Sequence, residues 1–123
     1  MDLTTWDDQA LVRLVGHNTA MQQRLLAKFL STSADTLAAL GEAHDQQDWA
    51  EVGRLAHSLK SAARSVGAMA LGEHCFALEQ AGKCADVQGC EALVRSLPDE
   101  AEPVFSLIRE RVQPRVAGVA AAP

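Results

Sequence analysis

Apolar residues recur at three- and four-residue steps along most of the chain, which is the spacing of one face of an α-helix. The first such segment is short, from Asp7 to Val15, and Gly16 follows it where a helix would end. A much longer segment begins after Asn18, a residue suited to capping a helix N-terminus, and continues to about His44. The pattern therefore predicts a short helix and then a long one, with one side of the long helix facing a core.

Two further helices are predicted from the residues that follow. The polar run HDQQD ends the long helix, and Asp48 can cap a third helix that reaches about Val66, where Gly67 supplies a stop. A fourth helix is predicted from near Ala68 to near Lys83. Its apolar stripe consists of Leu71, Cys75, Leu78 and Gly82. The short connections indicate that successive helices are antiparallel.

The last amphipathic segment runs from about Val87 to Val112 and contains two prolines, Pro98 and Pro103. Because proline lacks a backbone donor and its ring clashes with the preceding helical turn, we expect a kink or a break there. The final residues, 114–123, show no apolar periodicity, so we expect a disordered tail. The predicted organisation is therefore one bundle domain over residues 1–113, followed by the tail.

Together these segments predict an all-α fold, an antiparallel four-helix bundle with a short additional N-terminal helix. The length of 123 residues fits one ordinary domain. The chain is 48% hydrophobic, yet it has only three Phe, two Trp and no Tyr. Because Ala and Leu recur throughout, the composition suits packed helices better than a sheet.

Net charge and the lack of targeting features limit the classes of partner and the location. The formal net charge of -5 argues against a nucleic-acid-binding domain, which needs a basic face for the phosphates. No apolar run approaches the roughly 20 residues of a membrane span, and the start MDLTTWDD lacks the pattern of a signal peptide. The three cysteines lack C-x-x-C spacing, so reduced thiols are expected. We therefore expect a cytoplasmic protein without membrane insertion.

The stretch AHSLKSAARSVGA, residues 56–68, places His57 among small residues on the third predicted helix. At about 100° per residue, His57 points away from the apolar side of this helix and is predicted to face water. Gly53 and Ser61, one turn away on each side, are small enough to leave the imidazole clear. Three basic residues are predicted on the same side: Arg54, Lys60 and Arg64. His57 is therefore the candidate functional residue of this helix.

The presence of these residues at these positions can also be explained without any functional role. A lone surface histidine is usually just solvated, and the helix dipole favours cations such as Lys60 and Arg64 in the second half of a helix. The other three histidines lack a matching basic cluster. None of His44, His57 and His74 follows a glutamate three positions earlier, so a metal-binding bundle is not predicted. Position alone leaves the role of His57 open.

A longer string of residues around the histidine has a specific spacing. Its members are Ala56, His57, Leu59, Lys60, Gly67, Ala68, Leu71, Cys75, Leu78 and Glu79. This string resembles the histidine-containing phosphotransfer (HPt) domain family, whose pattern is A-H-x-L-K-G, then small residues and G-A, then L-x-x-x-C-x-x-L-E on the next helix. The resemblance extends over most of residues 4–112. Ser61 departs from it, because the family most often has glycine at that position.

The resemblance implies a phosphocarrier. His57 is expected to accept a phosphoryl group from the aspartyl phosphate of a receiver domain and to pass it to the aspartate of another. Lys60, about one turn along the helix, is expected to stabilise the phosphoryl charge. No carboxylate set is apparent beside the histidine, so we expect this chain to bind no metal or other cofactor and the receiver to supply Mg²⁺. The expected receiver docking face consists of Gly53, Arg54, Ser61 and Arg64.

The expected partners are the receiver domains of a hybrid sensor histidine kinase and of a response regulator, bound by a monomer. The sequence has no Gly-rich phosphate loop and no strand pattern for a nucleotide-binding fold, so ATP-dependent kinase activity is not expected. The alternative function is that of an adaptor that binds a receiver without phosphoryl transfer. The presence of both His57 and Lys60 counts against it. The identity of donor and acceptor and the direction of net flow stay open.

Overall fold

The computed structural model describes residues 6–121, with side chains described for residues 6–112. Five helices and no strand are present in this part of the chain. They are α1 (Gln9–Val15), α2 (Thr19–Asp45), α3 (Trp49–Val66), α4 (Met69–Lys83) and α5 (Val87–Ala121). Within the described residues, no helix combines the length and the apolar character that crossing a membrane requires. The prediction of an all-α fold is confirmed.

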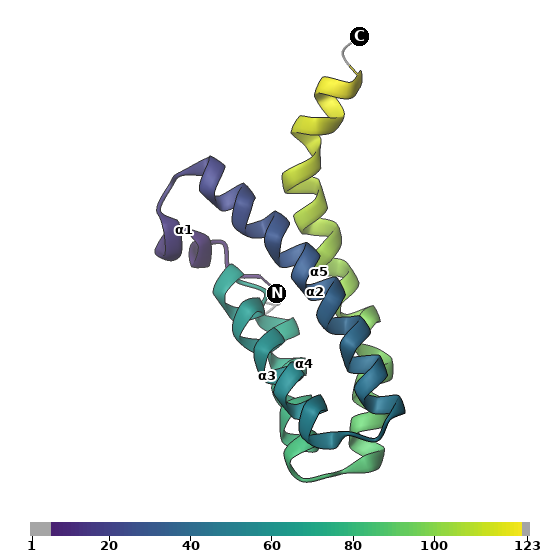
Figure 1. Ribbon diagram of the computed structural model, residues 1–123. Coiled ribbons are helices and arrows are strands. Elements are labelled where there is room, and N and C mark those ends of the chain that lie inside the picture. The colour runs from purple at the N-terminus through teal and green to yellow at the C-terminus, as the bar shows by residue number, and fades with distance from the viewer. Residues whose placement is uncertain (1–5, 122–123) are drawn as a thin grey trace.

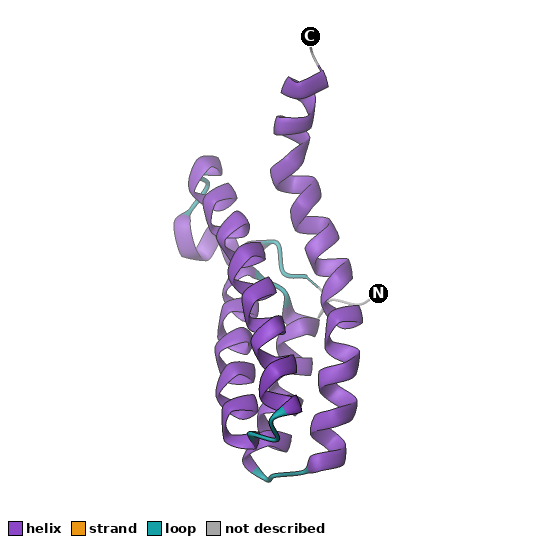
Figure 2. Ribbon diagram, turned by 45° about the vertical axis from the view of Figure 1, so that its right-hand side comes forward, coloured by secondary structure: helices purple, strands orange, loops and turns teal. Residues whose placement is uncertain are grey.

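Helices α2 to α5 lie side by side and alternate in direction, as the course of the chain in Figure 1 shows. The short helix α1 lies at one end, where it contacts α2 and α3. Helices α3 and α4 form the most extensive pair, and α5 packs against α2 and α4. The C-terminal part of α5 extends beyond the ends of the other helices (Figure 2). This arrangement is the predicted antiparallel four-helix bundle with a short N-terminal helix.

Local signals in the sequence set the ends of α2 and α3. Asn18 Oδ1 accepts a hydrogen bond of 3.1 Å from the backbone N–H of Met21. Asp48 Oδ1 accepts a hydrogen bond of 3.2 Å from the backbone N–H of Glu51. Each of these side chains therefore pairs with a backbone N–H that has no partner within the helix. Gly67 ends α3 with φ of 97°, a left-handed conformation that glycine adopts without strain. The predicted caps and stop are therefore confirmed.

The core of the bundle is built from one face of each long helix. The predicted stripe of α4 is buried throughout, at Leu71, Cys75, Leu78 and Gly82. On α3, Val52, Leu55, Leu59 and Val66 are buried at helical spacing, and Ala56 and Ala63 beside them are also fully buried. The buried face of α3 is wider than its apolar pattern indicates, because α2 packs on one side of it and α4 on another.

The last helix is not broken at its prolines. Of the kink or break that is expected, a break does not occur, because α5 continues through Pro98 and Pro103. Both prolines lie on the exposed side of the helix. Because proline has no backbone N–H, the carbonyl groups of Val94 and Asp99 lose their intrahelical donors. On this side they can accept hydrogen bonds from water instead. The opposite face is buried in the core at Leu97, Ala101, Val104 and Ile108. This packing outweighs the two missing hydrogen bonds.

Helix α5 also extends beyond its predicted end near Val112. Its backbone is helical up to Ala121, and this part includes most of the segment 114–123 for which a disordered tail is predicted. The segment is rich in alanine, the strongest helix former. Residues 122 and 123 lie outside the described residues, as do the side chains from residue 113 onward. The domain boundary after residue 113 stays a prediction.

Candidate functional site

His57 lies near the middle of α3 on the side that faces away from the core. Its side chain is 59% exposed, which agrees with the position expected from the helical periodicity. Neighbouring residues on the core side of the same helix, Ala56 and Leu59, are buried. The packing of α3 therefore holds the imidazole at the surface on a rigid element.

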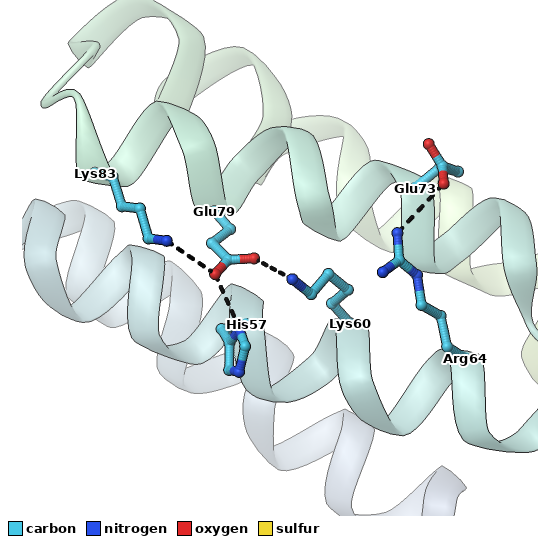
Figure 3. Close-up of polar contacts among 6 residues, drawn as sticks. All are labelled: His57, Lys60, Arg64, Glu73, Glu79 and Lys83. Atoms are coloured by element: carbon cyan, nitrogen blue, oxygen red, sulfur yellow. Dashed lines mark hydrogen bonds and ion pairs between the residues drawn. The ribbon is translucent and has the colours of Figure 1, made fainter.

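A buried carboxylate from α4 contacts this exposed imidazole. His57 Nδ1 lies 2.9 Å from Glu79 Oε2, and the Glu79 side chain is only 5% exposed. Figure 3 shows the carboxylate between the two helices, with the imidazole turned toward it. The sequence predicts no carboxylate set beside the histidine, whereas the structure places one carboxylate there.

Two lysines also contact the Glu79 carboxylate. Lys60 Nζ donates to Oε1 at 2.7 Å, and its side chain is only 14% exposed. The Lys60 ammonium also lies 5.3 Å from the centre of the Phe76 ring. Lys83 Nζ lies 3.5 Å from Oε2, the oxygen that also contacts His57. Glu79 is therefore the centre of a cluster with His57, Lys60 and Lys83 (Figure 3).

The cluster fixes the charge of Glu79. The hydrogen bond from Lys60 is the largest cause, and burial opposes it, but with the hydrogen bond from His57 the net effect lowers the Glu79 pKa from 4.5 to about 2. At neutral pH the carboxylate is therefore ionised and can only accept hydrogen bonds. It follows that His57 Nδ1 carries the proton in the shared hydrogen bond. The neutral imidazole then has its lone pair on Nε2, the ring nitrogen that points away from Glu79 in Figure 3.

The helical periodicity predicts Gly53 to be exposed beside the imidazole. In the structure Gly53 is instead buried. The reason is the close approach of α4 to α3 at this point. A Cβ atom on Gly82 would lie 2.8 Å from the backbone N of Gly53 and 3.0 Å from the carbonyl oxygen of Trp49. The absence of a side chain at Gly82 thus allows the helices to come close enough for Glu79 to reach His57.

An open hollow of about 570 Å³ lies beside His57 at this end of the α3–α4 pair. It is lined by Trp49, by small residues that include both glycines, and by the polar side chains of His57, Glu79, Arg54 and Lys83. The hollow combines an exposed nucleophilic nitrogen with positively charged side chains. It can therefore admit an anionic group to the imidazole.

The other predicted docking residues lie along the exposed side of α3. Arg54 is exposed and forms a bidentate pair with Glu51, with 2.8 Å between Nε and Oε1. Ser61 is exposed one turn beyond His57. Arg64 pairs with Glu73 at 3.3 Å and lies farther along the helix, apart from the cluster (Figure 3). The structure therefore brings Arg54 to the hollow but not Arg64.

The remaining candidate groups are occupied in packing. His74 Nε2 forms a hydrogen bond of 3.1 Å with Ser96 Oγ, which links α4 to α5. Burial raises the pKa of the Cys75 thiol to about 12, so Cys75 behaves as a buried apolar residue. Among residues 6–112, no group of three or more His, Cys, Asp or Glu side chains could hold a metal ion.

Two members of the cluster were not predicted from the sequence, Glu79 as a partner of the histidine and Lys83. One signal for Glu79 is present in the sequence. Its position is four residues after Cys75, on the apolar stripe of the fourth predicted helix. A carboxylate on a buried stripe requires a partner, because an unpaired buried charge is costly. Lys83 follows Glu79 by four positions, a spacing that places two side chains on the same face of a helix.

Comparison with known proteins agrees with the geometry. Residues 24–110 match the model of the Hpt domain family. The structure is similar to the crystal structure of histidine-containing phosphotransfer protein B (HptB) from Pseudomonas aeruginosa PAO1, with a TM-score of 0.84 and 26% sequence identity, over 91% of this chain and 97% of that chain.

The sequence is also similar to part of a much longer protein. It is 28% identical to the virulence sensor protein BvgS of Bordetella pertussis over 117 residues, which is 91% of this chain. It is 29% identical to BvgS of Bordetella parapertussis over 112 residues, which is 87% of this chain. The matched region spans 9% of the length of each of these relatives.

Proposed function

Because this chain belongs to the Hpt domain family, we propose that it is a phosphorelay carrier that accepts a phosphoryl group on His57 from a receiver aspartyl phosphate and passes it to the aspartate of another receiver. The observation that carries this proposal is the exposed imidazole, whose Nδ1 is held by a buried, ionised carboxylate. This contact leaves Nε2 free and directed outward. The family and the similar solved structure support phosphoryl transfer in two-component signalling.

The chemistry of the transfer follows from the tautomer. The Nε2 lone pair of His57 attacks the phosphorus of the aspartyl phosphate, so that an N–P bond forms and the P–O bond to the aspartate breaks. The aspartate leaves as a carboxylate. Positive charge develops on the imidazole during the attack, and the Glu79 carboxylate 2.9 Å from Nδ1 stabilises it. Transfer to the second receiver reverses these steps, and the chain needs no kinase activity of its own.

Lys60 acts in this proposal through Glu79. Its ammonium is committed to Oε1 of the carboxylate, so it holds Glu79 ionised and in place beside the imidazole. The direct stabilisation of phosphoryl charge by Lys60 that the sequence suggests stays a prediction. The contact with Glu79 makes Lys60 a positioning residue for His57.

A magnesium ion does not fit the residues around His57. Glu79 already accepts contacts from His57, Lys60 and Lys83, and Glu51 on the same side of α3 is paired with Arg54. Mg²⁺ prefers several free oxygen ligands, which these paired carboxylates do not offer. We therefore expect the Mg²⁺ of the reaction to come with the receiver domain.

The proposed partners are the receiver domains of a hybrid sensor histidine kinase and of a response regulator, which dock one at a time on a monomer. The similarity to a protein named as a sensor supports a place in a sensor pathway. Exposed Arg54 and Ser61 flank His57 on α3, and the hollow beside it is open. Gly53 is buried but lines this hollow, where α4 lies close to α3.

The test is phosphoryl transfer from a receiver domain that carries labelled phosphate on its aspartate. We expect the protein to acquire label that is stable to alkali and labile to acid, as a phosphohistidine is. The label should disappear in His57→Gln and persist in the control His17→Gln, which removes another exposed histidine. Binding of a receiver without any label on this chain would contradict the proposal and favour the adaptor function.

A further inference from the structure

We infer that Lys83 is the cation that leaves Glu79 and contacts the phosphoryl group when His57 is phosphorylated. This inference rests on the proposed function and assigns a role to a residue outside the predicted site. Lys83 is the last residue of α4, and its Nζ contacts the same oxygen, Oε2, as the imidazole of His57. One carboxylate oxygen therefore separates its ammonium from the reacting ring (Figure 3).

The two lysines of the cluster differ in how firmly they are held. Lys60 lies 2.7 Å from Glu79 Oε1 with its side chain 14% exposed, whereas Lys83 lies 3.5 Å from Oε2 with its side chain 64% exposed. Departure of Lys60 would remove the main partner of a buried carboxylate, which is strongly unfavourable. Departure of Lys83 leaves Glu79 paired with Lys60 and His57, and exposed ion pairs contribute little to stability. Lys83 is the lysine that can move.

The two arginines on the exposed side of α3 are less suited to this role. Arg54 lines the hollow, but both its Nε and its Nη2 contact the carboxylate of Glu51. Arg64 is paired with Glu73 and lies farther along α3. Among the described cations near His57, Lys83 is exposed, lines the hollow and makes only a long contact to its present partner.

Phosphorylation changes the charge balance in a way that favours this movement. A phosphoryl group brings close to two negative charges at neutral pH and several acceptor oxygens. It would stand on Nε2 of His57, a residue that lines the same hollow as Lys83. An ammonium on a flexible stem can then exchange one weakly held carboxylate oxygen for the phosphoryl oxygens. No bond to Lys83 forms or breaks in this step.

The chain allows a direct test because it contains only three lysines, Lys28, Lys60 and Lys83. Protein labelled with ¹⁵N-lysine gives one ammonium resonance for each of them. The full chain is phosphorylated on His57 with phosphoramidate, a small phosphodonor that requires no receiver. Lys28→Met and Lys83→Met assign the signals, and the third belongs to Lys60. On phosphorylation we expect the Lys83 signal to shift and its ammonium protons to exchange more slowly with water, with little change at Lys28.

A second readout measures the consequence for transfer. We expect Lys83→Met to slow phosphoryl acceptance from a phosphorylated receiver about fivefold or more, with Lys83→Arg retaining most of the rate. Lys28→Met removes a charge from an exposed site on α2 and should leave the rate unchanged. Slower transfer without any shift of the Lys83 signal would mean that Lys83 only steers docking, and it would overturn the inference.

The outcomes also separate this inference from the proposed function. If His57 is phosphorylated but neither the Lys83 signal nor the rate in Lys83→Met changes, the inference is wrong and the carrier function stands. A Lys60 signal that shifts in place of that of Lys83 would also overturn it and return the role to Lys60. If neither phosphoramidate nor a receiver labels His57, the proposed function fails and the inference fails with it.

Discussion

The imidazole of His57 and the carboxylate of Glu79 are joined by a contact of 2.9 Å between Nδ1 and Oε2, although 22 positions separate them in the sequence. The two residues belong to different helices, and the close packing of α3 on α4 brings them together. The ionised carboxylate determines which ring nitrogen carries the proton. In the proposed mechanism, the buried carboxylate thus controls the reactivity of the exposed imidazole.

The first prediction concerns the charge of this carboxylate. In Glu79→Gln the amide oxygen can still accept a hydrogen bond, but it offers no negative charge to a positively charged imidazole and its NH₂ group cannot pair with Lys60. We expect phosphoryl acceptance by His57 to fall tenfold or more. The ¹⁵N shifts of the imidazole should show a weaker preference for the proton on Nδ1.

The matched control for this variant is Glu73→Gln, which removes an exposed carboxylate of α4 that pairs with Arg64. Its transfer rate and imidazole shifts should be those of the unmodified protein. If Glu79→Gln behaves like this control, the carboxylate does not set the tautomer, and the proposed mechanism needs another source for the reactivity of Nε2.

The second prediction concerns stability against acid. The pKa of Glu79 is 4.5 as an ordinary glutamate and about 2 in the folded protein, with the Lys60 hydrogen bond as the largest cause. Because the folded pKa is the lower one, the stabilisation is fully present above about pH 4.5 and is lost as the pH falls toward 2. We expect the free energy of unfolding in urea to decrease by about 2 to 3 kcal/mol from this group between pH 5.5 and pH 2.5.

Lys60→Met provides the comparison, because it removes the largest cause of the low pKa while keeping an unbranched side chain of similar length. This variant should be less stable at pH 7, since Glu79 loses its main partner. Its stability should also vary less between pH 5.5 and pH 2.5. An equal dependence on pH in both proteins would contradict the assignment to the Lys60–Glu79 pair.

The third prediction concerns the glycines between α3 and α4. A methyl group on Gly82 would lie 2.8 Å from the backbone N of Gly53, and backbone atoms cannot move aside as a flexible side chain can. We expect Gly82→Ala to lower the free energy of unfolding by about 1 to 3 kcal/mol. Because α4 must then move away from α3, the contact of Glu79 with His57 should weaken and transfer should slow.

Gly41→Ala makes the same chemical change inside α2, where an added Cβ meets nothing within 4 Å. There the higher helix propensity of alanine should raise stability by about 0.5 to 1 kcal/mol and leave transfer unchanged. The two variants are compared by urea unfolding followed by circular dichroism. Effects of equal sign would show that the α3–α4 contact has room for a methyl group.

The helices and the position of His57 could be predicted because the signals for them are local. Apolar spacing places the imidazole on the exposed side of α3, and Asn18, Asp48 and Gly67 set helix ends through contacts within a few residues. The role of Glu79 could not be predicted in this way. Its partner lies on another helix, and the helical periodicity of one segment does not show which residues of the next segment will face it.

The wrong expectations have the same origin. Gly53 lies near His57 on the helical wheel, yet it is buried because α4 covers that flank of α3. Pro98 and Pro103 predict a break by their local effect, yet α5 is continuous because its other face is packed in the core. In each case a contact with another helix overrides the rule that applies to one helix alone.

The last prediction follows from the prolines in α5. Each proline removes a donor to the carbonyl group four residues earlier, and its ring crowds the preceding turn. Both side chains are exposed, so replacing them removes no core contact. Alanine would restore the backbone N–H, although it would also make the unfolded chain more flexible, which offsets part of the gain. We expect Pro98→Ala to raise the free energy of unfolding by about 1 to 2 kcal/mol.

The measurement is urea unfolding of Pro98→Ala, Pro103→Ala and the double variant. The gains should add approximately, because the two positions restore hydrogen bonds to different carbonyl groups, those of Val94 and Asp99. Phosphoryl transfer should stay unchanged, since the cluster around His57 is built on α3 and α4. A loss of stability would mean that the prolines give α5 a curvature that its packing requires. The continuous helix would then depend on its prolines.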